Sequence, residues 1–111
     1  MKLFELKGKT AVLLGGGGVL GGTMAKGLAS AGASVAVGDL IEENARKIAA
    51  EAASLGVKAM GYKLDAMSSD DLERVCSQVI SDFGKVDILI NAVGGNMKDA
   101  TTSDSVTFFD L

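Results

Sequence analysis

The chain has 111 residues, of which 48% are hydrophobic and 23% are charged, and its formal net charge is −3. This length and composition are typical of one small domain with a core of its own, here residues 1–111, and exclude a disordered segment. The negative charge and the lack of a basic run argue against nucleic acid as a partner.

The sequence also bears on the compartment. It contains a single cysteine, Cys76, which has no partner for an internal disulfide, and its N-terminus is charged where a signal peptide is apolar. Charged residues interrupt every apolar stretch before it reaches the roughly 20 residues of a membrane span. We expect a cytoplasmic protein without a membrane partner.

The first forty residues predict a strand, a helix and a second strand. Residues 10–14 form a short apolar run that stops at glycines, which is typical of a strand buried on both faces. Apolar residues recur at helical spacing from Leu20 to Ala31, and Gly32 supplies the stop. Residues 35–37 follow as the second strand.

A second helix is expected over residues 42–55, with Leu55 on its apolar stripe and Gly56 just past its end. Residues 57–64 mix β-branched and aromatic side chains, which indicates a third strand. 

The last two elements follow the same alternation. Ser68 and Asp71 form a capping pair for a third helix, whose apolar series runs over residues 72–83 and ends at Gly84. Residues 86–90 read as a fourth buried strand. The alternation predicts an α/β fold, a Rossmann-type doubly wound parallel sheet in three layers, with strand order 3-2-1-4 and truncated after the fourth strand.

The turn after the first strand is rich in glycine. Gly16, Gly18 and Gly21 fit G-x-G-x-x-G, which here follows a predicted strand and opens a helix. Glycines let a pyrophosphate approach the main chain, and the helix N-terminus offers N–H donors. We expect a nucleotide here; the alternatives are a tight turn without a ligand and the glycine-rich turn of adenosyl-methionine methyltransferases.

Asp39 follows the second strand, 24 positions after Gly15. A carboxylate at this distance accepts hydrogen bonds from both ribose hydroxyls of the adenosine and repels a 2′-phosphate. Because no Lys or Arg stands beside Asp39, NAD is favoured over NADP. The alternative is that Asp39 only caps the second helix, with Glu42 as its capping partner.

Two more polar residues close predicted strands. Asp65 closes the third strand, either as an adenine contact or as a turn residue. Asn91 closes the fourth strand, where the carboxyl ends of a parallel sheet form the ligand crevice. Since Gly94 and Gly95 follow it, we expect Asn91 to do more than form a turn.

In order and spacing, these features resemble the N-terminal half of the classical short-chain dehydrogenase/reductase family. The resemblance covers nearly the whole chain and rests on K-G-K-T-A-V over residues 7–12, the glycine turn, Asp39, Asp65 and V-D-I-L-I-N-A-V-G over residues 86–94. Within the family, the chain is most similar to the mannonate/fructuronate reductase branch, which acts on sugar acids.

The resemblance implies a nicotinamide dinucleotide as the cofactor, with NAD favoured over NADP because of Asp39, and hydride transfer between its nicotinamide and an alcohol or ketone substrate. It also implies four groups of cofactor contacts. These are Gly15, Gly17, Gly18, Val19, Leu20 and Gly21 for the pyrophosphate, Asp39 and Leu40 for the ribose, Asp65 and Ala66 for the adenine, and Asn91, Ala92, Val93 and Gly94 for the nicotinamide-side ribose.

The chain departs from the family in its turn, where Leu14 replaces a threonine and Val19 stands at the middle glycine, with the risk of crowding the backbone. The family's catalytic Ser and Tyr-x-x-x-Lys lie beyond Leu111, and four residues after the only tyrosine, Tyr62, stands Ala66.

We therefore expect the cofactor-binding part of a longer oxidoreductase, without turnover of its own. A non-catalytic dinucleotide-binding or regulatory module is the alternative. A third possibility is structural: a sheet that ends after the fourth strand leaves the outer edge of that strand unpaired, and because unpaired edges recruit other chains, self-association is then expected.

Overall fold

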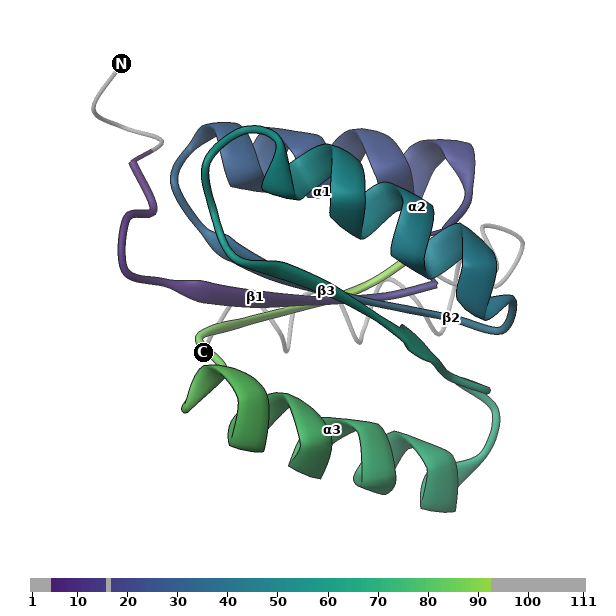
Figure 1. Ribbon diagram of the computed structural model, residues 1–111. Coiled ribbons are helices and arrows are strands. Elements are labelled where there is room, and N and C mark those ends of the chain that lie inside the picture. Colours follow the sequence, from purple (N-terminus) through teal and green to yellow (C-terminus); the bar gives the residue numbers. More distant parts are fainter. Residues whose placement is uncertain (1–4, 16, 93–111) are drawn as a thin grey trace.

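A four-stranded parallel sheet with helices on both faces forms the described part of the chain, residues 5–15 and 17–92, in the computed structural model (Figure 1). The strand order is β3-β2-β1-β4, which confirms the predicted Rossmann-type α/β sheet. The elements are β1 (Thr10–Leu14), α1 (Val19–Ser30), β2 (Ser34–Asp39), α2 (Glu42–Ala53), β3 (Ala59–Lys63), α3 (Ser69–Phe83) and β4 (Ile88–Asn91).

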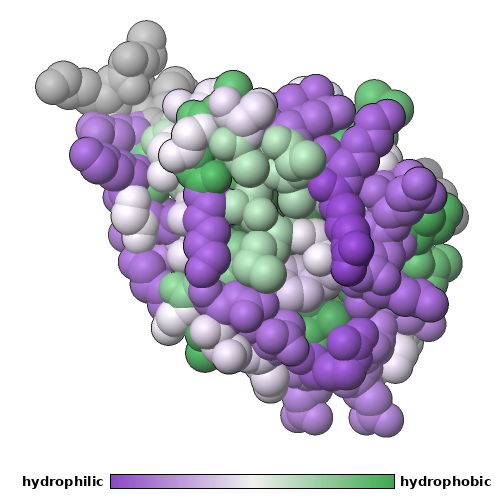
Figure 2. Space-filling model, in the orientation of Figure 1, coloured by the Kyte–Doolittle hydropathy of each residue, from purple (hydrophilic) through white to green (hydrophobic). Residues whose placement is uncertain are grey.

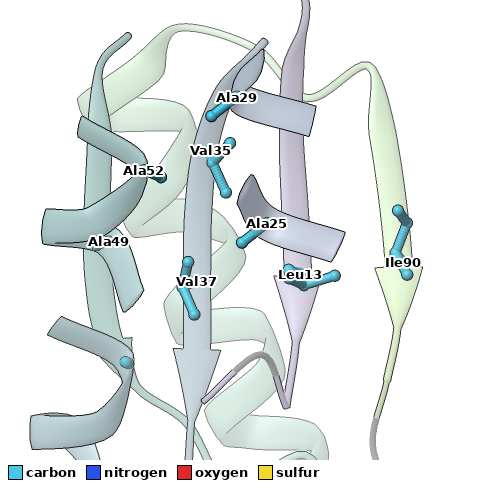
Figure 3. Packing of buried hydrophobic residues seen from close by; sticks show 9 residues of the cluster. Leu13, Ala25, Ala29, Val35, Val37, Ala49, Ala52 and Ile90 are labelled. Atoms are coloured by element: carbon cyan, nitrogen blue, oxygen red, sulfur yellow. The ribbon is translucent and has the colours of Figure 1, made fainter. Parts of the chain in front are cut away.

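Two buried clusters separate the three layers. Helices α1 and α2 cover one face of the sheet and α3 covers the other (Figure 1). Because successive strand residues point to opposite faces, Leu13 packs under α1 and α2, whereas Val12 and Leu14 pack on α3. The helix residues in the first cluster are alanines, which let α1 and α2 lie close to the sheet (Figure 3); they are Ala25, Ala29, Ala45, Ala49 and Ala52.

Several predicted boundaries differ from the structure. The third strand is shorter than residues 57–64, and the second helix ends at Ala53. Leu55, predicted on the buried stripe, is 47% exposed because it lies past that helix end. Ile80 is 53% exposed. The buried face of α3 is a narrow stripe at Val75 and Val79, and Ile80 lies one position, about 100°, around the helix from it.

Helix α3 has the predicted N-cap and stop residues, but only half of the predicted capping pair forms, because the Ser68 N–H donates to the Asp65 carbonyl and not to the side chain of Asp71. The Oγ of Ser68 accepts the backbone N–H of Asp71 at 3.2 Å, and Ser68 is the N-cap residue. At the other end, Gly84 takes the left-handed conformation with φ of 90° and donates its N–H to the carbonyl of Ile80. Ser68 and Gly84 could both be predicted from the sequence, because helix capping depends on residues only a few positions apart.

Asp87 links the segment before β4 to β1. Its Oδ2 accepts the Thr10 N–H at 2.8 Å and lies 3.1 Å from the Nζ of Lys85. The Thr10 hydrogen bond, followed by Lys85, lowers the pKa of Asp87 from its ordinary value of 3.8. A carboxyl with a lower pKa in the folded state stabilises the fold above its unfolded pKa, and this contribution is lost as the pH falls through the folded pKa.

We therefore expect the free energy of unfolding to decrease as the pH falls below 3.8, and Asp87→Asn to flatten part of that decrease. Urea unfolding over an acidic pH series measures the slope. Glu73→Gln, at an exposed carboxylate of α3, is the control. A slope equal in Asp87→Asn and wild type would contradict the assignment.

Weakly hydrophobic atoms, pale green in Figure 2, lie over α2 and β3 between hydrophilic purple ones. None of the described helices has the length and apolar character of a membrane span.

Strands β3 and β4 are the outer strands of the described sheet, and self-association through β4 stays a prediction.

Candidate functional site

Most of the predicted site residues that the structure describes lie at the carboxyl end of the sheet. Leu14 at the end of β1 pairs in register with Gly38 of β2 and with Asn91 of β4. Beyond the strands, the Gly15 N–H donates to the Gly38 carbonyl at 2.6 Å, and the Ala92 N–H donates to the Leu14 carbonyl at 2.8 Å. The glycine turn therefore lies between the residues that follow β2 and β4.

A groove of about 280 Å³ opens at this end of the sheet. The loop after β3 joins it, because the Leu64 N–H donates to the Asp39 carbonyl at 2.8 Å. A larger hollow of about 840 Å³ lies at the opposite end, beside Lys7, Gly32 and Val57, and none of the predicted site residues lines it. Those that line the groove are Gly15, Gly18, Asp39, Leu40, Asp65, Ala66 and Ala92.

The glycines of the turn have different roles. Gly15 has a φ of 77°, a left-handed conformation that favours glycine. A Cβ on Gly17 would lie 2.7 Å from the Cγ of Asp39 and 2.8 Å from the Cβ of Asn44, whereas a Cβ on Gly18 would meet open space. Gly17 thus allows the turn to approach Asp39. Gly16 lies outside the described residues.

The carboxylate of Asp39 is held by two backbone donors. Its Oδ1 accepts the Gly17 N–H at 3.2 Å, and its Oδ2 accepts the Ile41 N–H at 3.0 Å. The N-cap of α2 is Ile41, and Glu42 is the first helical residue, so the interpretation of Asp39 and Glu42 as a capping pair is wrong. Each carboxylate oxygen can accept more than one hydrogen bond, so the fixed carboxylate keeps capacity for further donors.

Large apolar side chains are exposed around the groove. Val19, the first residue of α1, is 92% exposed, so its side chain is turned to solvent instead of crowding the turn. Leu20, Leu40 and Met67 are also exposed, and green atoms appear at the right edge of Figure 2, the end at which the strands finish in Figure 1. Exposed apolar patches of this kind mark interaction sites. Gly21, by contrast, is buried in α1.

Asp65 lies two residues past the end of β3 and does not close the strand as predicted. Its Oδ1 accepts the Met67 N–H at 3.0 Å, and its own N–H donates to the Oδ2 of Asp71 at 2.6 Å. Asn91 is the last residue of β4, as predicted. Val93 and Gly94, also predicted for the site, lie outside the described residues.

Sequence reasoning missed three residues here. Asn44 faces Gly17, Met67 lines the groove, and Arg74 donates to the carboxylate of Asp71. Asp71 was seen only as a capping residue. Nothing in the local pattern distinguishes these positions from ordinary surface residues, because each depends on a contact across the fold.

The only tyrosine has a structural contact. The Tyr62 hydroxyl donates to the Oδ2 of Asp82 at 2.6 Å. Burial, and then Asp82, raise the pKa of Tyr62 well above its ordinary value of 10.0, and the same hydrogen bond lowers the pKa of Asp82. A tyrosine that acts as a proton acceptor needs a pKa near the working pH, so Tyr62 is unsuited to that role.

Comparisons with known proteins agree with this geometry. The short chain dehydrogenase family matches residues 9–110. An uncharacterized oxidoreductase of Haemophilus influenzae is 42% identical over 107 residues, which cover 96% of this chain and 38% of that protein. A 2-dehydro-3-deoxy-D-gluconate 5-dehydrogenase of Formosa agariphila is 39% identical over 93 residues, which cover 83% of this chain and 35% of that protein.

A solved structure is similar in the same region. It is a Haemophilus influenzae protein provisionally named D-mannonate oxidoreductase, with bound NAD, and it has a TM-score of 0.80 at 40% identity over 86% of this chain and 34% of its own. The chain thus spans little more than a third of the length of these relatives. Because the family match covers nearly all of its residues, the chain belongs to the short-chain dehydrogenase family.

Proposed function

We propose that this chain binds NAD in the groove and is the cofactor-binding part of an oxidoreductase that acts on an alcohol or ketone, with a sugar acid as substrate. The observation that carries the proposal is the carboxylate of Asp39, held by the N–H groups of Gly17 and Ile41 beside the glycine turn. The names of the Haemophilus and Formosa relatives support the substrate class.

The N-terminus of α1 suits a pyrophosphate. Its N-cap is Gly18, which has no side chain to occupy the first N–H groups, and the first turn contains no acidic residue. Helices α2 and α3 instead begin with acidic residues, which complement their own dipoles. The free donors and the partial positive charge of α1 are therefore available for an anion. We place the pyrophosphate on Gly15, Gly17, Gly18, Val19, Leu20 and Gly21.

The remaining contacts follow the groove outward from the turn. In this proposal Asp39 and Leu40 hold the adenosine ribose, and Asp65 and Ala66 contact the adenine. Asn91 and Ala92, together with Val93 and Gly94, hold the nicotinamide-side ribose. NAD supplies the hydride chemistry when bound, while the side chains and backbone of the chain bind and orient it.

The position of Asp39 supports NAD over NADP. Two unit charges about 4 Å apart repel by roughly 1 kcal/mol in water and about 4 kcal/mol near a protein surface. A 2′-phosphate beside this carboxylate would therefore weaken binding about fivefold or more. The carboxylate cannot turn away without losing the hydrogen bonds to Gly17 and Ile41.

Asp39→Asn tests the proposal because it removes the charge of the side chain, while its single amide oxygen can keep one of the hydrogen bonds from Gly17 and Ile41. We expect NAD affinity to fall about tenfold, since hydrogen bonds from ribose to a charged acceptor contribute roughly 1.5–3 kcal/mol. NADP affinity should rise, so that the ratio of NAD affinity to NADP affinity becomes smaller. Isothermal titration calorimetry of the purified chain measures both, and Glu43→Gln, an exposed carboxylate of α2, is the control.

Absence of NAD binding to the wild-type chain would overturn the proposal. Equal binding of NAD and NADP would overturn only the preference. We also propose that the 111-residue chain binds NAD without turnover, since Tyr62 is engaged with Asp82. Oxidation of a sugar acid by the purified chain would contradict this part.

A further inference from the structure

We propose that Asp71 and Arg74 of α3 are positioning residues that hold the loop of Asp65 and Ala66 in the orientation needed to recognise the purine of the cofactor. The inference rests on the proposed function, because it concerns the adenine end of the same groove. Neither residue lines that groove, so each would act through the loop.

A bridge of hydrogen bonds joins the end of β3 to the loop. One amino group of Arg74 donates to the Lys63 carbonyl at 3.1 Å and to the Oδ1 of Asp71 at 2.6 Å. The Nε of Arg74 donates to the same Oδ1 at 3.0 Å. The other oxygen of Asp71, Oδ2, accepts the Asp65 N–H at 2.6 Å. Lys63 and Asp65 are thus tied together through two side chains of α3.

Helix capping does not account for this use of Asp71. In a capping box, the side chain three residues after the N-cap returns to the N–H of the N-cap residue. Here the Ser68 hydroxyl accepts the Asp71 N–H in the usual way, but the Ser68 N–H donates to the Asp65 carbonyl at 3.0 Å. The Asp71 carboxylate reaches past Ser68 to the loop instead.

The bridge fixes Asp65 from its backbone side. The Asp65 carboxylate is held in turn by the Met67 N–H at 3.0 Å, and Ala66 and Met67 line the groove beside it. The Asp65 hydrogen bond, followed by Arg74, lowers the pKa of Asp71, so this carboxylate is ionised at neutral pH and its hydrogen bonds are charge-assisted. An otherwise exposed loop therefore presents its carboxylate in one direction.

The experiment compares NAD with nicotinamide hypoxanthine dinucleotide, in which a carbonyl oxygen replaces the purine amino group at C6 and the neighbouring N1 carries a hydrogen. A carboxylate that accepts a hydrogen bond from the amino group favours NAD. We expect wild type to prefer NAD, and Asp71→Asn to weaken NAD binding roughly three- to tenfold while changing binding of the analogue less. Asp70→Asn, which removes the neighbouring charge in the same helical turn, should behave as wild type.

A second measurement needs no ligand. Amide hydrogen exchange of Asp65, followed by NMR, should be faster in Asp71→Asn than in Asp70→Asn. Arg74→Gln, at an exposed position, removes the other half of the bridge and should shift the preference in the same direction. Circular dichroism confirms that each variant is folded.

The outcomes separate the two proposals. If wild type binds neither dinucleotide, the proposed function fails, and this inference fails with it. If wild type prefers NAD and Asp71→Asn keeps the same preference, the inference is overturned and the proposed function stands. The same holds if Asp71→Asn weakens the binding of both dinucleotides by the same factor. A wild type without preference between the dinucleotides also overturns the inference.

Discussion

Gly61→Ala is expected to destabilise the protein by about 3 kcal/mol, at the upper end of the usual effect of an oversized core residue. A Cβ at this position of β3 would lie 2.6 Å from the backbone carbon of Ala45 and 2.6 Å from the backbone nitrogen of Arg46. Backbone atoms of a helix cannot rotate aside as a side chain can. To admit one methyl group, α2 would have to move off the sheet.

Strand propensity predicts the opposite sign for this substitution. Alanine weakens a strand less than glycine does, but the whole propensity scale spans only about 1 kcal/mol. The steric term is larger, so the net effect is destabilising. Gly27→Ala provides the control, because its Cβ would meet nothing within 4 Å. This substitution should stabilise α1 by about 1 kcal/mol, since alanine favours a helix more than glycine does. Urea unfolding measures both, and a Gly61→Ala midpoint at or above that of wild type would contradict the prediction.

Gly17→Ala is expected to reduce NAD affinity about 10- to 100-fold. The added Cβ would meet the Asp39 carboxylate, 2.7 Å from its Cγ, and displace it from the position in which it accepts the Gly17 N–H. Gly17 is not among the glycines with positive φ, so the backbone itself admits alanine. The effect therefore reports the contacts of the new Cβ with Asp39 and with the Cβ of Asn44, and not backbone strain.

A double variant separates this contact from a general disturbance of the turn. If Gly17→Ala acts by displacing the carboxylate, adding it to Asp39→Ala should weaken NAD binding no further than Asp39→Ala alone. Gly18→Ala lies in the same turn but has open space at its Cβ, so it should leave Asp39 in place. The NMR chemical shifts of Asp39 in the free protein, compared with those of wild type, would show this. Strictly additive losses in the double variant would contradict the mechanism.

Much of the fold was predictable because its signals are local. The buried run of β1, the helical spacing of α1 and the caps of α3 at Ser68 and Gly84 each lie within a few residues of sequence. The predictions that were wrong concern where helices and strands end and which helix residues face solvent. Leu55 and Ile80 are apolar, and periodicity alone does not say whether a neighbouring layer covers them.

The candidate site was predictable in its residue types and not in its contacts. Strand ends in a parallel α/β sheet meet at one edge, so the glycine turn, Asp39, Asp65 and Asn91 were expected near one another. The interpretation of Asp39 as a helix cap was wrong, because the chain takes two further residues before α2 begins. Whether these residues bind NAD stays a prediction for the titrations above.

By itself, the sequence determined the alternation of strands and helices, the glycine-rich turn and the carboxylates that follow the strands, all of which depend on neighbours along the chain. Only the tertiary structure decided that Gly17 faces Asp39, 22 residues away, and that Gly61 admits the backbone of α2. It also decided that the carboxylate of Asp71 serves the loop of Asp65. The physical reason is that such contacts depend on strand register and on how closely a helix approaches the sheet, and neither is written in any short stretch of sequence.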